Sequence, residues 1–441
     1  MRRTFRPYRT ADAIIAVVAD VRPFRALRYS PHLDLASAVC PPFDTISPDQ
    51  QSALHQRSPY NAVRIELAGD DNGDRYQNAA ETLGRWRRDG TLLRDERPAF
   101  YLYRQRFRSD AREYTRTMLF SRLRLEPWAA GVVLPHEQTF GGPKEDRLRL
   151  LRATGLNTSP VFLIYRDAEG RVRQRLEREG GETVADFAAD DGQHHTLVRL
   201  DDPAVVRALV EAFEPQTLYV ADGHHRYETA LGYRDERRAQ TAKWTGQEPE
   251  NFALAALTAA VDPGLLVLPI HRVTSAGQPA EEALRRLRLL FDVWVLSSAA
   301  ALTSALTARG AGHFGMAAAG DANLYLLSMR DRHGIERLLP QEASPAWRRL
   351  DYAIANHAIL RHCLGLSETQ MHDYAALWFT EDAGEAVQQV QAGRARYAVL
   401  LNPVPVSGVL DVADSGERMP QKSTFFYPKV PTGLVFNPLE D

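Results

Sequence analysis

The spacing of apolar and polar residues along the chain predicts a mixed α/β protein. Apolar runs that contain β-branched and aromatic residues predict strands at 100–107, 118–125 and 218–221. Apolar residues three or four positions apart predict helices between the strands. The first of these begins at the cap Asp74 and ends near Gly90.

The last third of the chain continues this alternation. Helical spacing appears at 280–291 and 299–308, and a long helix is predicted at 345–363. Asp262-Pro263-Gly264 follows a hydrophobic strand and is typical of a boundary. We therefore predict an N-terminal mixed α/β region (1–125), a second module (126–264) and a C-terminal α/β region (265–441). Apolar side chains in the tail predict that it packs back on the body: Phe425, Phe426, Tyr427, Leu434, Val435 and Phe436.

Composition and charge narrow the classes of function. The chain has 441 residues, with 54 Lys and Arg against 56 Asp and Glu, so its formal net charge is −2. This balance offers no basic field for a polyanion, and we do not expect a nucleic-acid partner. Cys40 and Cys363 alone cannot supply a disulfide scaffold or a cysteine-built metal site. No apolar run is long enough to span a membrane, so we expect a cytoplasmic protein without a membrane partner.

The strongest local signal for chemistry is a strand that runs into a turn and a helix start, Asp222-Gly223-His224-His225-Arg226. A helix N-terminus offers free N–H groups, glycine lets a ligand approach the backbone, and arginine binds phosphate through two hydrogen bonds. We predict that Gly223 and Arg226 bind phosphate and that Asp222, His224 and His225 are catalytic. The alternative is that Asp222 only caps the helix and that the histidines lie in an exposed turn.

A second cluster of charged residues lies on a Gly/Pro-rich loop and the short helix after it. A kinase needs cations on the transferred phosphoryl group, carboxylates for Mg²⁺ and a base near the acceptor hydroxyl. The predicted roles are catalysis (Glu137), phosphate binding (Lys144, Arg147), metal binding (Asp146) and pocket lining (His136, Asn157). The alternative is a surface helix whose charges pair along one face.

Two further segments carry ligand candidates. Asp44 follows Pro41 and Pro42, and it either contacts a ligand or only orders the turn. The tail offers cations and hydroxyls for phosphate (Lys422, Ser423, Thr424) and pocket residues (Tyr427, Lys429), with aromatic packing as the alternative. The pair His194-His195 has no partner at metal-ligand spacing, so we predict a solvated turn there.

The segment around Gly223 resembles the nucleotide-phosphate motif of the ParB/sulfiredoxin fold. Gly223, His225, Arg226 and Tyr227 match the sulfiredoxin form, but His224 stands where that enzyme has its catalytic cysteine. Sulfinic-acid reductase chemistry is therefore not implied. Against the ParB form, Gly223 and Arg226 match and His224 replaces an acidic residue. Free-serine kinases that resemble this fold carry a similar Asp-Gly-His motif, and they fit best.

Over nearly its whole length the chain resembles a prokaryotic family catalogued as domain of unknown function 1015 and often labelled ParB-like. Besides 221–230, the matching stretches are Pro23–Leu27, Cys40–Ser47, Ser58–Asn61, Leu134–Glu137, Gly142–Arg147 and Lys422–Lys429. The resemblance implies a mixed α/β (α+β) fold in which a ParB/sulfiredoxin-like nucleotide-binding module is embedded in a larger mixed-sheet protein.

From these observations we expect a phosphotransferase that uses ATP or ADP with Mg²⁺ and acts on a small hydroxyl-bearing metabolite, with free serine as the first candidate. Its partners would be the nucleotide and the small substrate, and a homo-oligomer stays open. The chief alternative is a ParB-like nucleotide-binding regulatory or DNA-associated protein. The absence of a basic surplus and of an evident helix-turn-helix argues against it. A third alternative is an inert ligand-binding protein.

Overall fold

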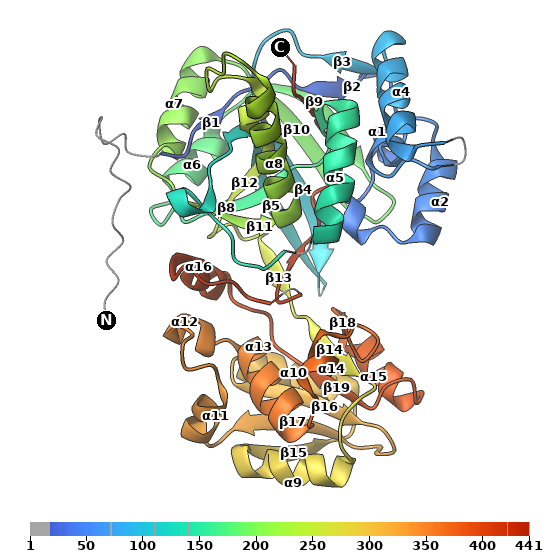
Figure 1. Cartoon of the computed structure of the whole chain (residues 1–441), viewed down its shortest axis with the longest axis vertical. Helices are drawn as coiled ribbons and strands as arrows, with labels where there is room; N and C mark the ends of the chain where they lie inside the picture. The colour runs from blue at the N-terminus through green and yellow to red at the C-terminus, as the bar shows by residue number, and fades with distance from the viewer. Residues whose placement is uncertain (1–17, 71–72, 110, 140, 421, 441) are drawn as a thin grey trace.

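The structure is a computed structural model that describes residues 18–70, 73–109, 111–139, 141–420 and 422–440. The start of the predicted N-terminal region, residues 1–17, lies outside the described residues. Figure 1 shows a larger upper body and a smaller lower body, each built on a sheet flanked by helices. This arrangement confirms the predicted mixed α/β class. In the described part of the chain, no helix is both long and apolar enough to cross a membrane.

The larger sheet has nine strands and is buried on both faces. In spatial order they are β6 (Val133–Leu134), β11 (Leu218–Asp222), β8 (Val161–Tyr165), β12 (Phe252–Ala259), β5 (Arg112–Arg124), β4 (Phe100–Ser109), β10 (His194–Leu200) and β9 (Glu182–Ala188), with β1 (Val21–Arg22) paired to β5. In β4, Tyr101 and Tyr103 enter one apolar core while Phe100 and Leu102 enter the other. Successive side chains of a strand point to opposite faces, so burial on both faces explains the nearly continuous apolar runs.

Helices cover the second core: α6 (Arg171–Arg178), α7 (Pro203–Phe213) and α8 (His224–Gln240). α8 lies at the front of the larger body in Figure 1, with α5 (Gly141–Thr154) beside it. As predicted, Asp74 caps α4 (Arg75–Arg88), because its carboxylate accepts a hydrogen bond from the Tyr76 N–H at 2.9 Å. The remaining elements of this body are α1 (Leu35–Ala38), η1 (Phe43–Thr45), α2 (Pro48–Arg57), α3 (Val63–Glu66), η2 (Trp128–Ala130), η3 (Pro249–Asn251) and a two-stranded antiparallel sheet of β2 (Leu27–Tyr29) and β3 (Leu92–Arg94).

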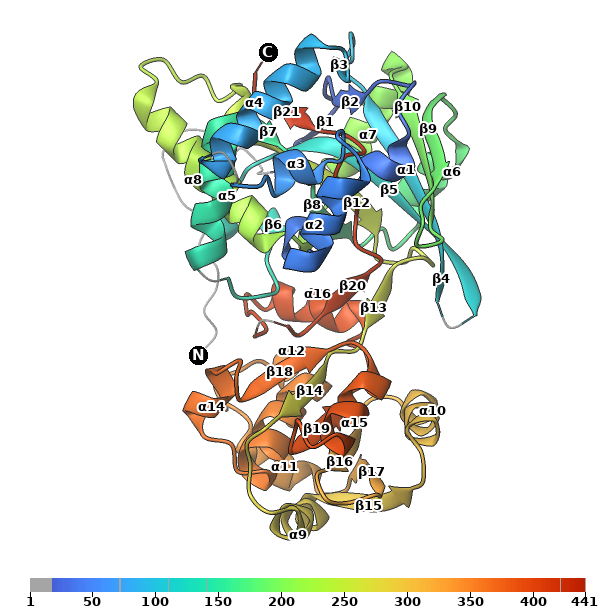
Figure 2. The ribbon, with the colours of Figure 1, turned by 90° about the vertical axis from the view of Figure 1, so that its right-hand side faces the viewer.

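The smaller body contains an antiparallel six-stranded sheet, seen at the bottom of Figure 2. Its order is β15 (Phe291–Leu296), β17 (Leu324–Met329), β16 (His313–Ala318), β19 (Tyr397–Leu400), β14 (His271–Thr274) and β18 (Leu377–Thr380). Its helices include α9 (Ala280–Leu290), α10 (Ala299–Arg309), α11 (Arg332–Leu338), α14 (Glu368–His372) and α15 (Ala383–Gln391). The first two match the predicted helices at 280–291 and 299–308 to within a residue.

The predicted long helix at 345–363 is wrong. The chain forms α12 (Pro345–Arg348), α13 (Asp351–Ile354) and then a π-helix, η4 (Ala355–Cys363). Leu350 breaks the helix because its backbone is extended, with ψ 136°, and its side chain is buried in the core. Tertiary packing has overridden helical periodicity here.

The C-terminal segment returns from the smaller body to the larger one and is buried along its way, as its apolar residues predict. After α16 (Val406–Asp414), β20 (Phe425–Tyr427) pairs with β13 (Leu266–Leu268), which links the bodies. Further on, Thr432 bridges Cys40 and Phe436 bridges Leu27, and β21 (Asn437–Pro438) pairs with β7 (Leu156–Asn157).

Of the two predicted boundaries, the one near residue 264 falls between β12 and β13, where the chain leaves the larger sheet. The one at 125/126 falls inside that sheet, because β5, which ends at Arg124, pairs with β12. The tail also contributes to the larger body. The three-part division of the chain stays a prediction.

Phe436→Ala tests how much the returning tail stabilises the fold. Phe436 is 0 % exposed and its ring centroid lies 5.9 Å from that of Tyr29. Truncation leaves a cavity, so the free energy of unfolding should fall by about 3–5 kcal/mol in urea denaturation. The control Leu289→Ala, at a side chain 60 % exposed, should change it by less than about 0.5 kcal/mol. An unchanged urea midpoint for Phe436→Ala would show that the tail does not dock in this way.

Candidate functional site

Two parallel strands end at one edge of the larger sheet and bring the two main predicted clusters together. β6 pairs in parallel with β11, with Val133 opposite Leu218. The chain therefore leaves both strands at the same edge, as 135–137 and as 222–224. The His136 N–H donates to His224 Nε2 at 3.3 Å, across 88 positions of sequence. The carboxyl ends of parallel strands are the usual ligand sites of α/β sheets.

The turn after β11 depends on Gly223. Its φ of +91° is strained for any residue with a side chain, and a Cβ there would lie 3.0 Å from Nε of Arg226. Arg226 folds back over this turn, donating from Nη2 to Asp222 at 2.8 Å and from Nη1 to the carbonyl of Pro160. The guanidinium is thus held beside the first turn of α8, whose leading N–H groups have no partner within the helix.

Asp222 is shared by two cations. Besides Arg226, Lys429 from the tail places Nζ 3.4 Å from its second oxygen. Burial alone would raise the pKa of Asp222, but the charges of Lys429 and Arg226 outweigh it and hold this pKa well below its ordinary range. Asp222 is therefore an anion at neutral pH, fixed between a helix residue and the C-terminal segment.

Asp44 faces the same charges from η1. Its side chain is accessible at the surface, yet the surrounding protein desolvates it and raises its pKa. The charge of Asp222 adds to this rise, and Arg226 and Lys429 oppose it. His225 also belongs to this field, because its pKa is lowered by burial and then by Lys144. Asp44, predicted as a pocket residue, thus lies within the electrostatic reach of Asp222.

His136 and His224 are buried and neutral. His136 has Nδ1 2.6 Å from the Val220 carbonyl and Nε2 2.9 Å from Oγ1 of Thr424, so Nδ1 carries the proton and Nε2 accepts from the hydroxyl. Burial lowers the pKa of His136 to about 4, and burial also holds the pKa of His224 well below its ordinary value. The two rings contact each other edge to face, 4.8 Å apart. The two histidines and Thr424, which was predicted to bind phosphate, thus form a chain of hydrogen bonds that joins residue 136, the start of α8 and the tail.

Glu137 differs from Asp222 in its charge state. Burial raises the pKa of Glu137 to about 8, against the opposing field of Lys422 and with a further rise from Asp222. Its backbone forms a parallel bridge with Met419. A carboxyl group that titrates near neutral pH is suited to take or give a proton. It stands three residues beyond the end of β6, at the edge of the sheet that carries Asp222.

Lys144 reaches the first turns of α8 through Glu228. It forms an ion pair with this glutamate, which also accepts hydrogen bonds from Trp128 Nε1 at 3.2 Å and Thr139 Oγ1 at 2.7 Å. Sequence analysis missed Glu228. Its position one helical turn after His224 was the available signal. Glu228 fastens the loop before α5 to α8.

Several predicted site residues have structural partners instead. Asp146, predicted as a metal ligand, binds Arg75, Arg147 and the Tyr76 hydroxyl, and Arg147 in turn donates to the Glu66 carbonyl at 2.9 Å. Asn157 accepts from the Leu254 N–H and from Asn437 of the tail. Ser423 donates to the Pro420 carbonyl. Among the described residues, no group of three or more His, Cys, Asp and Glu could hold a metal ion.

A cavity of about 480 Å³ adjoins the Asp222 site on the side of Lys429. It lies between the 36–57 segment, the β9–β10 turn and the tail, and its lining includes Pro42, Thr45, His195, Phe425 and Tyr427. The prediction of a solvated turn for His194-His195 is wrong. Both residues lie in β10, and His195 is buried against the Tyr103 hydroxyl at 2.7 Å. Tyr427 lines this cavity, and its predicted role toward a ligand stays a prediction.

Arg116 is a further residue that sequence analysis missed. It is fully buried and donates to the carbonyl of Pro428 at 2.6 Å and to that of Tyr427 at 3.4 Å, next to Lys429. Strand alternation places residue 116 on the same face as Met118 and Phe120, and an arginine at that inward position was the available signal. Arg116 positions the tail segment that supplies Lys429.

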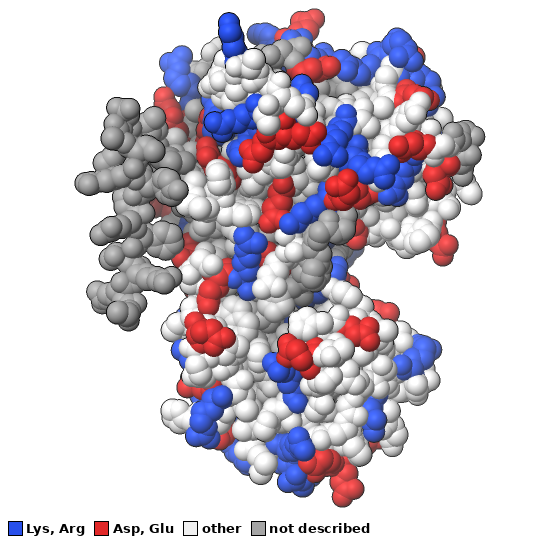
Figure 3. Space-filling model, in the orientation of Figure 1, with Lys and Arg blue, Asp and Glu red and all other residues white. Residues whose placement is uncertain are grey.

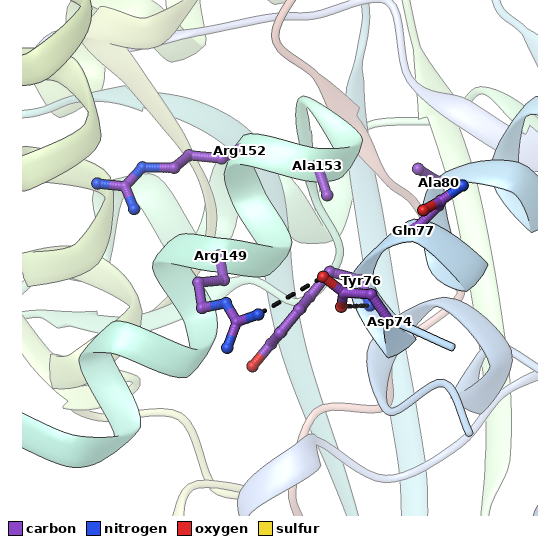
Figure 4. A pocket seen from close by; sticks show the side chains of 7 residues that line it. All are labelled: Asp74, Tyr76, Gln77, Ala80, Arg149, Arg152 and Ala153. Carbon is purple, nitrogen blue, oxygen red and sulfur yellow. Dashed lines mark hydrogen bonds and ion pairs between the residues drawn. The ribbon is translucent and has the colours of Figure 1, made fainter. Parts of the chain in front are cut away.

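An open cleft of about 540 Å³ between α4 and α5 is shown in Figure 4. There the Arg149 guanidinium lies 4.3 Å from the Tyr76 ring centroid and 3.5 Å from Asp74, and Arg152 pairs with Glu236. The charges of both arginines are thus matched by acids, as expected of a surface helix. On the face in Figure 3, basic and acidic side chains are interspersed and no basic stripe is visible.

The model of the family described as "Protein of unknown function (DUF1015)" matches residues 21–353, and the chain belongs to this family. That range contains both parallel strand ends and the Asp222–Arg226 turn. The tail that supplies Lys429 lies beyond it. A search of curated proteins finds no match.

Solved structures give weak similarities. A conserved hypothetical protein from Pyrococcus furiosus is 12% identical with a TM-score of 0.32, covering 69% of this chain and 91% of that one. A free serine kinase in complex with AMP is 12% identical with a TM-score of 0.33, covering 69% and 89%. SbnI from Staphylococcus aureus, with a C-terminal truncation, is 11% identical with a TM-score of 0.34, covering 73% and 87%. We therefore interpret the site from its own geometry.

The neutral state of His136 predicts a pH-dependent stability. Its pKa is about 4 in the folded protein and 6.5 as the reference value, so the unfolded chain binds more protons between these values. The contribution of neutral His136 to the free energy of unfolding is complete above pH 6.5. It decreases by about 3 kcal/mol as the pH falls to 4. In urea unfolding at pH 7, 6 and 5, His136→Gln should reduce the slope of stability against pH. The exposed control His333→Gln should keep the wild-type slope, and equal slopes for all three proteins would contradict the assignment.

Proposed function

We propose that the protein is a nucleotide-dependent phosphotransferase that acts on a small hydroxyl-bearing metabolite. The observation that carries this proposal is the pairing, at one sheet edge, of a cation-flanked helix N-terminus with a carboxyl group that titrates near neutral pH. The helix N-terminus with its cations suits the phosphates of ATP or ADP, and the carboxyl group suits the removal of a proton from an acceptor hydroxyl. The Asp-Gly-His motif makes free serine the first acceptor to test.

In this proposal the phosphates lie against the first turn of α8. The N–H groups after Gly223, the Arg226 guanidinium and Lys429 are the groups that bind them. Asp222 holds both cations in place before the ligand arrives, so little side-chain entropy is lost on binding. The adjoining cavity near Lys429 accommodates the nucleoside part, with Phe425 and Tyr427 as aromatic lining.

The donor set also suits Mg²⁺, which usually takes one or two carboxylates and completes its shell with substrate phosphates and water. Asp222 is ionised, and Asp44 is accessible and feels the charge of Asp222. These two carboxylates would hold the ion, which supplies charge neutralisation at the phosphates. Asp146, committed to two arginines and Tyr76, is no part of this set.

The proposed step transfers one phosphoryl group. The bond between the terminal phosphorus and its bridging oxygen breaks, and the oxygen leaves with the electron pair on ADP or AMP. A new bond forms between that phosphorus and the acceptor oxygen, and the hydroxyl proton passes to the Glu137 carboxylate. Lys422, whose charge acts on Glu137, favours the ionised form that accepts this proton.

The experiment that tests the function is a nucleotide-consumption screen over amino acids, sugars and hydroxy acids, with ATP and with ADP. We expect one hydroxyl compound to accelerate nucleotide loss and to appear as its phosphate ester. If nucleotide binds but no hydroxyl compound accelerates its loss, the phosphotransferase proposal fails. A salt-sensitive gel shift would then favour the regulatory, DNA-associated alternative.

Replacing the proposed base separates chemistry from binding. Glu137→Gln should lower kcat by about 100-fold or more while nucleotide affinity changes little, because an amide cannot take the proton. In the wild type, kcat/KM should rise with pH around 8, since the base must be deprotonated and its pKa is about 8. Steady-state kinetics from pH 6 to 9 measure both effects. The exposed control Glu145→Gln should match the wild type, and a profile that falls with pH would exclude Glu137 as the base.

Replacing the proposed phosphate cations tests the other half of the site. Arg226→Ala and Lys429→Gln should each weaken ADP binding by about tenfold or more in calorimetry, because each removes a charged partner of the phosphates. Circular dichroism confirms folding, and the control Arg149→Gln removes an arginine from the α4–α5 cleft. Wild-type affinity for ADP in both variants would place the nucleotide elsewhere.

A further inference from the structure

A second cavity, of about 220 Å³, lies where the two bodies meet. Gln138 and Pro420 of the larger body form one side, and Arg272, His357, Arg361 and Phe379 of the smaller body are among the residues on the other. Its volume is below the 300–1,000 Å³ or so of pockets for drug-sized ligands, so it suits a small metabolite.

Arg272 is the residue that makes this cavity suited to an anion. The residue is 2 % exposed, and its guanidinium carbon lies 5.7 Å from the Phe379 ring centroid. Its partners are neutral: Nη1 donates to the Ile270 carbonyl, and Nε lies 3.4 Å from Oδ1 of Asn356. In the described part of the chain no carboxylate comes within ion-pair distance of Arg272. A buried cation without a counter-ion, on the wall of a cavity, is the arrangement that an anionic ligand completes.

The rest of the lining sets the charge of that anion. Asn356, His357 and Arg361 all come from the π-helix η4, a form found often at functional sites. Arg361 pairs with Glu368 at 2.6 Å, and both line the cavity. The lining also holds His357, whose pKa is lowered by burial and then by Arg361, and His372, whose Nδ1 lies 3.8 Å from Glu368. Two arginines thus stand against one glutamate, and this excess of cations favours an anion such as a carboxylate.

The cavity is connected to the Asp222 site through the backbone of residues 136–138, because His136 contacts His224 and Gln138 lines the cavity. Residues 136–138 pair with Met419, through the Met419 N–H to the His136 carbonyl at 2.6 Å and the Gln138 N–H to the Met419 carbonyl at 3.1 Å. Gln138 and Pro420 then line the cavity. Tyr374, also in the lining, has its pKa raised by burial and then by the charge of Glu137. Glu137 thus stands between the phosphate site and this cavity.

We propose that this cavity binds the carboxylate of a small hydroxy acid or hydroxy amino acid through Arg272 and Arg361, and so selects the acceptor of the phosphoryl group. The assignment of the ligand as acceptor rests on the proposed function, whereas carboxylate binding itself can be measured without turnover. The ligand would bind by its carboxylate at Arg272, with its hydroxyl toward Glu137.

The binding test uses L-serine, glycolate and D-glycerate in calorimetry without nucleotide, with L-serinamide as the match for serine that keeps the hydroxyl and amine but lacks the carboxylate. At least one carboxylate should bind to the wild type, and serinamide should bind at least tenfold more weakly than serine. Arg272→Gln and, should that variant fail to fold, Arg361→Gln should weaken carboxylate binding at least tenfold. The control Arg349→Gln, an exposed arginine outside the lining, should not. Equal binding of serine and serinamide, or no carboxylate binding, would overturn the proposal.

A gain of affinity makes the test independent of structural damage. Glu368→Gln removes the acid that pairs with Arg361, so carboxylates should bind several-fold more tightly, which a damaged cavity would not produce. Turnover measurements distinguish the failure of one proposal from the failure of the other. If carboxylates bind in a manner that requires Arg272 but no nucleotide is consumed, the cavity assignment holds and the phosphotransferase proposal fails. If an uncharged alcohol is phosphorylated at the same rate as a hydroxy acid, the phosphotransferase proposal holds and the cavity assignment fails.

Discussion

The site depends on one interaction, the sharing of the partly buried Asp222 carboxylate by Arg226 and Lys429. A desolvated carboxylate is costly unless it is paired, so these two cations make an anion at the end of β11 tolerable. Each cation has its own support. Arg226 packs closely over the turn where Gly223 has no Cβ, and Lys429 follows tail residues whose carbonyls accept hydrogen bonds from Arg116. Residues 207 positions apart therefore close the site, and the returning tail is part of its construction.

The titratable groups around Asp222 are driven to different charge states by their surroundings. Asp222 stays ionised beside two cations, whereas burial lets Glu137 hold a proton up to a pKa of about 8. His136 and His224 stay neutral because both are buried and each has a nitrogen committed as a hydrogen-bond acceptor. Two carboxyl groups with separated pKa values can divide the work of electrostatic binding and proton transfer. The hydrogen bonds of the buried His136 and His224 link the strand end that carries Glu137 to the turn that carries Asp222.

Local signals in the sequence predicted local structure well. The Asp74 cap and the strand, turn and helix around Gly223 are confirmed because each depends on neighbours in the chain. Partner choice was not predictable in this way. Asp146 pairs with Arg75, Asn157 binds the tail, and Leu350 interrupts a periodic helix, since each depends on distant residues. The parallel pairing of β6 with β11, which unites Glu137 with Asp222, is likewise a property of the fold, so the sequence indicated the parts of the site but not their juxtaposition.

Residues 136–138 connect the Asp222 site with the Arg272 cavity, which affects how ligands at the two places would interact. His136 contacts His224, Gln138 lines the cavity, and their backbone partner Met419 precedes Lys422 and Thr424. A ligand that ordered these residues from one side would reduce the entropy still to be lost when the second binds, so the two affinities would reinforce each other. Linkage requires this effect to be reciprocal. A carboxylate at Arg272 would therefore tighten nucleotide binding by the same factor by which nucleotide tightens the carboxylate, even in a Glu137→Gln protein that cannot turn over.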